Sequence, residues 1–385
     1  MLTLPTKDPV WIATPQHLLA MVEEISNEPV VAVDTESNSL YVYRERVCLV
    51  QISTPTTDYL VDPLAINDLT PLAQLFADNS RQKIFHAAEY DVICLKRDYG
   101  FEFHNIFDTM IAARILGETQ VGLGSLLQIN FSIKLDKRFQ RADWGKRPLS
   151  QAMLDYARMD THFLFDLKLL LEAKLSEKDL LELAREDFNL VCATNPTEQE
   201  PNGKSCWKVS GNARLSPRES AILHSLCAYR DMYARKVDLP HFKVMSNDLL
   251  VEITRANPGT LEEMKDVAGM SENVYKRHAD GLLKAVLAGN SAPPLKRERT
   301  TRPDPATLTR LNALHEWRKE QGKKLEVESD VVLPREIMEK IATRNPANLS
   351  ELKSIMQKIP WRFTRYGSAI LAVTHAKGST NETII

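Results

Sequence analysis

Residues 29–36 read PVVAVDTE, an apolar run that ends in two acidic residues, Asp34 and Glu36. Such a run predicts a β-strand over Pro29–Asp34 that is covered on both faces, because a half-exposed strand would alternate apolar and polar residues. If the strand reaches Glu36, both carboxylates leave the same face of the sheet and could hold a cation together. Taken alone, the pair is more typical of an ordinary surface strand end.

The segments around this strand alternate short β-rich runs with helical patterns through the first 175 residues. Further strands are predicted over Arg46–Ser53, Asp58–Asp62 and Gln82–His86, and the turn at residues 54–57 joins the first two as a hairpin. Helices are predicted over Leu69–Asp78, Glu89–Tyr99, Thr109–Leu116 and Ser150–Leu175. This order favours an α/β domain with a mixed sheet and a hairpin on one side.

The C-terminal half contains an internal repeat with an offset of 88 residues. The offset places Leu226 on Leu314, Tyr229 on Trp317, Arg230 on Arg318, Lys236 on Lys324, Ile253 on Ile341, Asn257-Pro258 on Asn345-Pro346, Leu261 on Leu349 and Lys265 on Lys353. In each copy the Asn-Pro pair is expected to end a helix, and the Thr260 or Ser350 region is expected to cap the next one. We therefore predict two small all-helical domains of one kind.

The predicted boundaries follow from composition. We place the α/β domain at residues 1–192 and the helical domains at 218–289 and 306–378. Residues 193–217 and 290–305 are polar or proline-rich, which is typical of linkers.

In each helical domain the ring of Tyr229 or Trp317 is expected in the core with the following Arg packed along it. Binding of a base or a phosphate by these pairs is the alternative.

Charge is distributed unevenly along the chain. The net charge is −2, but residues 1–203 hold 19 Lys and Arg against 30 Asp and Glu, whereas residues 204–385 hold 30 against 21. An acidic half next to a basic half suggests metal binding or catalysis in one and polyanion binding in the other. Two solvated surfaces that differ by chance are the alternative. Residues 291–385 carry 17 basic and 11 acidic residues, which favours the second helical domain for binding a polyanion.

The five cysteines show no zinc-binding spacing, and Cys48 and Cys94 lie in apolar runs as small core residues would. The chain shows no secretion signal and no apolar run of membrane-spanning length. We therefore expect a reducing, cytoplasmic location, no membrane association and no obligate protein partner.

Two further segments carry candidate site residues. Asp91 lies early in a predicted helix in FHAAEYDVICL, directly after the strand that ends at His86. Tyr156 and Asp160, in LDYARMDTHFLF, are one turn apart on one helix face. An acid that favours the helix dipole, a core tyrosine and a solvated aspartate are the plain alternatives. Together the four acids form an all-oxygen ligand set that suits Mg²⁺ or Mn²⁺, whereas zinc would prefer His and Cys.

These three segments resemble the three motifs of the DEDD superfamily of 3′–5′ exonucleases, in the subclass with Tyr in the third motif. The paired C-terminal domains resemble helicase-and-RNase-D C-terminal (HRDC) repeats, and the whole layout is similar to the bacterial ribonuclease D family. The stretch from FDTMIAARILG to DYARMDTHFLFDL is also similar to the exosome-associated nuclease of eukaryotes. The resemblance implies an RNase H-like fold and two divalent cations.

The resemblance also implies roles for the five residues. Asp34 would bridge both metals, Glu36 and Asp160 would complete the site that activates water, and Asp91 would hold the second metal. Tyr156 would orient the nucleophilic water. Two such ions can activate the water and stabilise the leaving oxygen in an in-line displacement.

Several other residues are weaker candidates. His86 could touch the substrate, although a histidine at a strand end is more often structural. Asp108 is expected to cap the helix at Thr109 rather than to bind metal. A basic stretch before the Tyr156 helix includes rings that could stack a base. Its candidate substrate-binding residues are Arg138, Arg141, Trp144, Lys146 and Arg147, with Lys134, Lys137 and Phe139 in the same stretch. An ordinary solvated loop is the alternative.

The function expected from these features is a metal-dependent exoribonuclease that shortens RNA from the 3′ end and releases nucleoside 5′-monophosphates. The resemblance implies structured RNA precursors as substrates, tRNA foremost. The alternatives are a DNA-acting enzyme of the same superfamily and an RNA-binding protein whose nuclease domain is inert.

Overall fold

The computed structural model describes residues 4–196, 206, 209, 215–296 and 303–375. They form two compact units. One unit contains Met1–Glu36, Val47–Pro196 and Arg302–Ile385, and the other contains Ser37–Arg46 and Thr197–Thr301. The predicted linkers at 193–217 and 290–305 lie largely or partly outside the described residues, as do residues 376–378 at the end of the last predicted domain.

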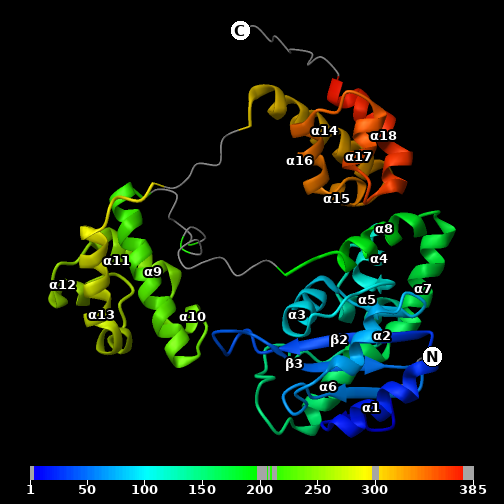
Figure 1. Cartoon of the computed structure of the whole chain (residues 1–385), viewed down its shortest axis with the longest axis horizontal. Helices are drawn as coiled ribbons and strands as arrows, with labels where there is room; N and C mark the ends of the chain where they lie inside the picture. The colour runs from blue at the N-terminus through cyan, green and yellow to red at the C-terminus, as the bar shows by residue number, and fades with distance from the viewer. Residues whose placement is uncertain (1–3, 197–205, 207–208, 210–214, 297–302, 376–385) are drawn as a thin grey trace. The chain divides into compact units, whose positions relative to one another are not determined.

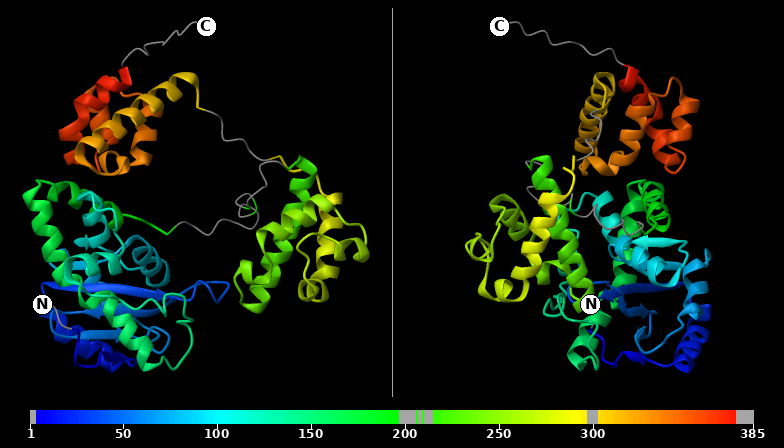
Figure 2. Two further views of the ribbon diagram at one scale, coloured as in Figure 1. Left: turned by 180° about the vertical axis from the view of Figure 1, so that it is seen from behind. Right: turned by 60° about the vertical axis from the view of Figure 1, so that its left-hand side comes forward.

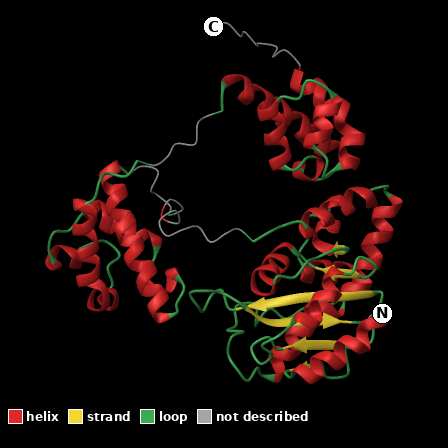
Figure 3. Ribbon diagram, in the orientation of Figure 1, coloured by secondary structure: helices red, strands yellow, loops and turns green. Residues whose placement is uncertain are grey.

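The first unit is built on a mixed sheet, as predicted, and the sheet has six strands where four were predicted (Figures 1 and 3). The strands are β1 (Val10–Ile12), β2 (Val30–Ser37), β3 (Val47–Ser53), β4 (Asp58–Val61), β5 (Gln82–Phe85) and β6 (Ile106–Asp108). Their order is β1-β4-β3-β2-β5-β6. The β3–β4 pair is the expected antiparallel hairpin, and the β1–β4, β2–β5 and β5–β6 pairs are parallel.

Strand β2 is covered on both faces. Val31 and Val33 belong to one buried cluster, which also contains Val92 of α3, whereas Ala32 belongs to a second cluster with Leu167 of α7. The apolar run therefore has no polar alternation because neither side of it meets water.

The helices of this domain are α1 (Pro15–Glu24), α2 (Ala73–Ala77), α3 (Glu89–Tyr99), α4 (Thr109–Ile115), α5 (Leu123–Phe131), α6 (Gln151–His162), α7 (Leu164–Glu177) and α8 (Leu181–Cys192), with short 3₁₀ turns η1 (Ile25–Asn27) and η2 (Thr70–Leu72).

The predicted single helix over Ser150–Leu175 is wrong, because the chain breaks at Phe163 into α6 and α7. The break lets α6 pack on β3 and β4 while α7 packs on β5 and α4. A straight helix of that length would leave one of these surfaces uncovered. The helix predicted over Leu69–Asp78 is likewise shorter, with η2 followed by α2.

The second helical repeat belongs to the same unit as the sheet. It contains α14 (Pro305–Leu325), α15 (Ser329–Val332), α16 (Arg335–Arg344), α17 (Leu349–Ile355) and α18 (Pro360–His375). Helix α18 packs against α8, where the fully buried Arg362 pairs with Glu186 at 3.1 Å and with Asp187 at 2.9 Å. Gly117, at φ +81°, lies directly against the backbone carbonyl of Glu326, where a side chain would collide.

The other unit contains the first repeat, with α9 (Pro217–Val237), α10 (His241–Val244), α11 (Asn247–Ala256), α12 (Leu261–Lys265) and α13 (Glu272–Ser291). It also contains the loop Ser37–Arg46, where the Tyr43 hydroxyl donates to Asp231 at 2.7 Å and the Tyr43 backbone N–H donates to Asp238 at 3.1 Å. Figure 2 shows both units from two further directions.

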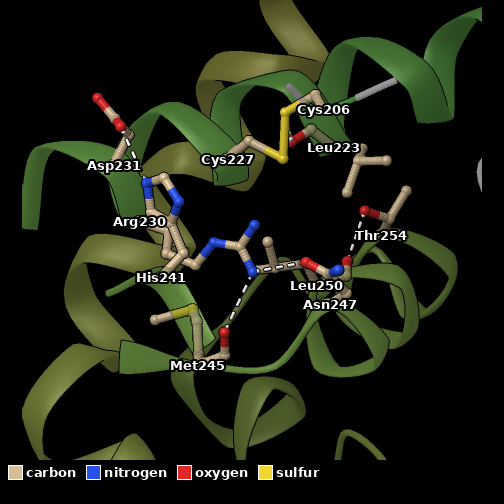
Figure 4. Close-up of a disulfide and its surroundings, with 10 residues drawn as sticks. All are labelled: Cys206, Leu223, Cys227, Arg230, Asp231, His241, Met245, Asn247, Leu250 and Thr254. Atoms are coloured by element: carbon tan, nitrogen blue, oxygen red, sulfur yellow. Dashed lines mark hydrogen bonds and ion pairs between the residues drawn. A yellow bond between two sulfur atoms is a disulfide. The ribbon is translucent and has the colours of Figure 1, made fainter. Parts of the chain in front are cut away.

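The 88-residue offset is visible in the hydrogen bonds of the two repeats. Buried Arg230 donates to the carbonyl of Met245 at 3.1 Å (Figure 4), and buried Arg318 donates to the carbonyl of Leu333 at 3.0 Å. Both arginines therefore have the structural role that the sequence favoured. Asn257 and Asn345 both end a helix in the left-handed conformation. Thr260 caps the next helix in the first copy, but in the second copy the cap is Asn348 rather than Ser350.

Cys206 and Cys227 form a disulfide in the first repeat (Figure 4). Cys48 and Cys94 are buried free thiols, as expected. Among the described residues, no helix has both the length and the apolar character needed to cross a membrane.

Candidate active site

The four acidic candidates lie on three elements of the sheet domain. Strand β2 continues through Ser37, so Asp34 and Glu36 both belong to it, as the sequence argument required. Asp91 lies in the first turn of α3 and is 6% exposed, and Asp160 lies on α6. The Thr35 hydroxyl donates a hydrogen bond to Asp91, which ties α3 to β2.

The carboxylates are close enough to shift one another's pKa. Burial raises the pKa of Asp34, and the charges of Asp91, Asp160 and Glu36 raise it further. Burial and the charges of Asp160 and Asp91 raise the pKa of Glu36 to about 9. Burial raises the pKa of Asp91 to about 7, and burial together with the Asp91 charge raises that of Asp160 to about 7. The fold therefore gathers acidic groups in a place where burial and their mutual proximity make ionisation unfavourable.

Divalent cations fit this set by donor chemistry, since all four side chains offer oxygen ligands and none forms an ion pair with a described Lys, Arg or His. In the described part of the chain, no three His, Cys, Asp or Glu side chains are already gathered tightly enough to hold an ion as they stand.

A cavity of about 280 Å³ opens beside these acids. Asp34, Asp160, Tyr156 and His86 line it, together with residues of the segments 122–125 and 135–140. Glu36 and Asp91 are not part of its wall. We call this space the carboxylate cavity.

Tyr156 is held by its neighbours. Its ring lies 5.8 Å from the Phe139 ring and 6.0 Å from the Trp144 ring, measured between centroids. Burial and then the charges of Asp160, Glu36 and Asp34 raise the pKa of the phenol well above its usual value. The hydroxyl therefore stays protonated at neutral pH and can exchange hydrogen bonds with a water in the carboxylate cavity.

A buried polar network fixes the helix that carries Tyr156 and Asp160. Asp58 of β4 accepts from Arg158 at 2.7 and 3.0 Å, from Ser53 at 2.7 Å and pairs with His162 at 3.0 Å. Arg158 and His162 flank Asp160 by two residues on either side. The Asp58 network was not foreseen from the sequence, because Arg158 and His162 lie 100 and 104 residues from Asp58 and show no local pattern with it.

Asp108 has the capping role that the sequence favoured. Its carboxylate accepts from the N–H groups of Met110 and Ile111 at the start of α4, at 2.8 and 3.1 Å. It also accepts from the N–H groups of Ala87 and Ala88 at 3.1 and 2.7 Å. Ala87 has φ +64°, an uncommon conformation for a residue with a side chain, so Asp108 stabilises the turn that leads into α3 and Asp91.

His86 lines the carboxylate cavity but is also tied to the scaffold. Its Nδ1 lies 2.9 Å from the Thr109 hydroxyl, and burial lowers its pKa to about 4. The ring is therefore neutral at pH 7 and does not offset the charge of the acids. A contact with substrate stays a prediction.

Two of the candidate substrate-binding residues are structural. Trp144 is 1% exposed in a cluster with Leu49, Leu60 and Ala157, so a base cannot stack on it. Arg147 donates to Asp62 at 2.7 Å from two nitrogens and to the Cys48 carbonyl at 2.6 Å.

Arg138, Arg141 and Lys146 are exposed in the structure. Arg138 pairs with Asp136 at 2.6 Å, and Lys146 lies 3.9 Å from Asp143. Substrate contacts by these three residues stay predictions.

Comparison with known proteins adds to this geometry. A family model described as a 3′–5′ exonuclease matches residues 9–176, and a model of the HRDC domain matches residues 219–286 and 307–374. Ribonuclease D of Gluconacetobacter diazotrophicus is 30% identical over 381 residues, which cover 95% of this chain and 93% of that protein. The chain belongs to the ribonuclease D family. It is therefore a hydrolytic exoribonuclease with an RNase H-like catalytic domain, and the exonuclease family is generally dependent on divalent metal ions.

Eukaryotic proteins are similar over a shorter stretch. Protein RRP6-like 3 of Arabidopsis thaliana is 34% identical over 282 residues, which cover 67% of this chain and 32% of that protein. The chain thus spans about a third of the length of this plant relative. The catalytic core of RRP6 from Trypanosoma brucei has a TM-score of 0.67 at 28% identity, covering 75% of this chain and 81% of that one.

Proposed function

We propose that this ribonuclease D family member trims the 3′ extensions of structured RNA precursors, tRNA foremost, and releases nucleoside 5′-monophosphates. One observation carries the proposal: four carboxylates from β2, α3 and α6 come together next to a cavity that also contains Tyr156, and the charges of Asp91 and Asp160 raise the pKa of Asp34 and Glu36. A small cavity at such a site suits a single terminal nucleotide better than the middle of a chain.

In the proposed mechanism, Asp34, Glu36, Asp91 and Asp160 would hold the divalent cations. The cations would supply Lewis acidity for the attack of water on the terminal phosphodiester bond. Tyr156 holds the attacking water by a hydrogen bond from its phenol. Thr35 orients Asp91 through the hydrogen bond already described. Asp58 and Asp108 act at a distance, because they fix α6 and the start of α3.

The second repeat supports the choice of a structured substrate. Lys340, Arg344 and Lys358 line a cavity of about 710 Å³ that is also lined by Arg114 and Glu89 of the sheet domain. Lys340 pairs with Glu336 of its own helix, and Arg114 pairs with Asp330. A phosphate backbone could replace such exposed pairs, which are worth little in water. Contacts between basic side chains and phosphates raise the affinity for RNA of any sequence. They weaken as the salt concentration rises.

The test uses a precursor tRNA with a 3′ trailer, the matched mature tRNA and a DNA strand with the sequence of the trailer. We expect nucleoside 5′-monophosphates from the precursor, resolved by thin-layer chromatography, and much slower release from the other two. Nucleoside 3′-monophosphates, or equal rates on RNA and DNA, would contradict the proposal.

A further inference from the structure

A second cavity adjoins the carboxylate cavity. Its volume is about 910 Å³, and it lies between helix α5 and the segment 134–138. We call it the α5 groove. Five residues line both spaces: Gly124, Ser125, Leu135, Asp136 and Lys137. The two cavities are therefore neighbouring parts of one depression, and a chain whose end lies in the first continues naturally into the second.

The wall of the α5 groove combines apolar and polar groups. Ile129 is 58% exposed, and Leu135 is half-buried beside it. Single exposed apolar residues are common, but here two of them share one concave wall. Ser125 and Gln128 are three residues apart on α5 and therefore lie on one side of the helix. An apolar wall with hydroxyl and amide groups beside it suits the faces of bases and the hydroxyls of ribose.

The charge of the α5 groove is opposite to that of the carboxylate cavity. Lys134, Lys137 and Arg138 line it and are all exposed. The one carboxylate in its wall, Asp136, accepts from the Arg138 backbone at 2.9 Å and from Arg138 Nε at 2.6 Å, so its charge is already offset. Because Arg138 is the partner of Asp136, Lys134 and Lys137 remain available to bind an anion. Because Lys137 also lines the carboxylate cavity, positive charge lies at the junction of the two spaces.

We propose that the α5 groove binds the single-stranded RNA tail just upstream of the nucleotide being removed, with bases against Ile129 and Leu135 and phosphates at Lys134 and Lys137. The inference rests on the proposed function and specifies where its substrate lies. The acids repel a polyanion, whereas the lysines attract it, so the groove supplies the affinity that the carboxylate cavity lacks.

Binding is measured by fluorescence anisotropy on an Asp34→Asn background, which prevents cleavage, with RNAs of two, four and eight nucleotides. Lys134→Ala with Lys137→Ala is expected to weaken the eight-nucleotide RNA about tenfold, because two phosphate contacts are lost. The dinucleotide, which can reach Lys137 at the junction but does not extend to Lys134, should weaken less, by about threefold. The slope of log affinity against log salt should become shallower by about 1.4, at 0.7 per phosphate of a single strand.

Two further variants separate the causes. Ile129→Asn is expected to weaken the eight-nucleotide RNA about threefold with an unchanged salt slope, because it removes an apolar contact and no charge. Lys7→Ala with Lys178→Ala removes the same charge from exposed positions that line neither cavity, and should leave all affinities within twofold. All variants change exposed side chains, so their melting temperatures should match that of the parent.

Equal losses on the dinucleotide and the eight-nucleotide RNA would overturn the proposal, as would a loss in the Lys7 and Lys178 control equal to that in the Lys134 and Lys137 variant. The proposed function is judged separately, by nucleotide release from the parent protein. A parent that shows the length-dependent binding but releases no nucleotide would support the α5 groove and contradict the proposed function.

Discussion

At the scale of single residues, the site depends on groups whose charge or position is fixed by neighbours. The charges of Asp91, Asp160 and Glu36 add to burial in raising the pKa of Asp34, and burial and nearby carboxylates keep the phenol of Tyr156 protonated. A protonated phenol whose ring packs against two other rings can orient a water but cannot serve as a base at neutral pH. The proposed division of labour follows, with carboxylates for cations and the phenol for water.

Replacement of Tyr156 by Phe tests this division. Tyr156→Phe keeps the ring contacts with Phe139 and Trp144, so the melting temperature and RNA affinity should be unchanged. The turnover rate should fall about 10- to 100-fold, because the water loses its orientation. Single-turnover cleavage of a labelled RNA measures the rate. A variant as fast as the parent would exclude the water-orienting role.

Asp58 links the stability of the protein to pH. Burial acts to raise its pKa, but the hydrogen bonds from His162, Ser53 and Arg158 outweigh burial and hold the pKa below its usual value. A lowered pKa in the folded state means that Asp58 contributes stability above its unfolded pKa, and that this stability is lost as pH falls through the folded value.

Asp58→Asn should lower the free energy of unfolding by about 3 kcal/mol at pH 7, because Arg158 is left buried without its partner. Urea unfolding of the parent and the variant from pH 7 down to pH 3 measures the difference. The difference should shrink as Asp58 of the parent is protonated. A difference that is constant over this range would show that the charge of Asp58 is not responsible.

At the scale of elements, the ends of strands and helices position the acids. Asp108 ends β6 and caps α4, and through Ala87 and Ala88 it also fixes the turn before α3. One buried carboxylate therefore sets the relative position of two helices. Because α3 carries Asp91, a local change at Asp108 should reach the site.

Asp108→Asn tests that connection, since the amide can serve fewer of the four N–H groups. We expect a stability loss of about 1–3 kcal/mol and a lower turnover rate with unchanged affinity for RNA. Asp155→Asn is the matched control, because it makes the same chemical change at an exposed aspartate. Asp155 lies on the helix that carries Tyr156. If the two variants have equal turnover, Asp108 does not position Asp91.

The elements that sequence reasoning identified are those with a local pattern. β2, β3, β4 and β5 are marked by apolar runs, and the mixed sheet with its hairpin was predicted from them. β1 and β6 were missed because strands of three residues are too short to show a period. The break at Phe163 was missed because packing on two different surfaces, rather than helix propensity, causes it.

In the candidate site too, sequence reasoning identified what has a local pattern and missed what depends on distant partners. The motif acids and Tyr156 were identified from local sequence, and their roles remain predictions. Trp144 and Arg147 were predicted to contact substrate. Their structural role was missed because it depends on residues far away in the sequence: Arg147 pairs with Asp62, 85 residues away. The α5 groove combines a helix and a basic segment that the sequence did not connect.

At the scale of the whole molecule, the second repeat is part of the unit that contains the sheet domain. Val331 belongs to the same buried cluster as Leu164 and Leu167, and Arg362 is enclosed by Glu186, Asp187 and the Val331 carbonyl. Removal of this repeat would expose that cluster, so its part in RNA binding is better tested by point changes than by truncation.

Arg362→Leu should lower the free energy of unfolding by about 3–5 kcal/mol, because Glu186 would remain buried without its positive partner. Burial already raises the pKa of Glu186 even with Arg362 present. Arg365→Leu, an exposed position on the same helix, is the control and should change stability by less than about 0.5 kcal/mol. Equal unfolding midpoints for both variants in urea would contradict the importance of the buried pair.

The most direct test of the central claim uses a 5′-labelled RNA with a duplexed body and a single-stranded 3′ tail. The parent and Asp34→Asn are compared in Mg²⁺, in Mn²⁺ and with a chelator. The account predicts a ladder that shortens from the 3′ end in the parent, only with metal, and no shortening by Asp34→Asn although it binds the RNA. An intact tail with the parent in both metals, or equal shortening by Asp34→Asn, would contradict it.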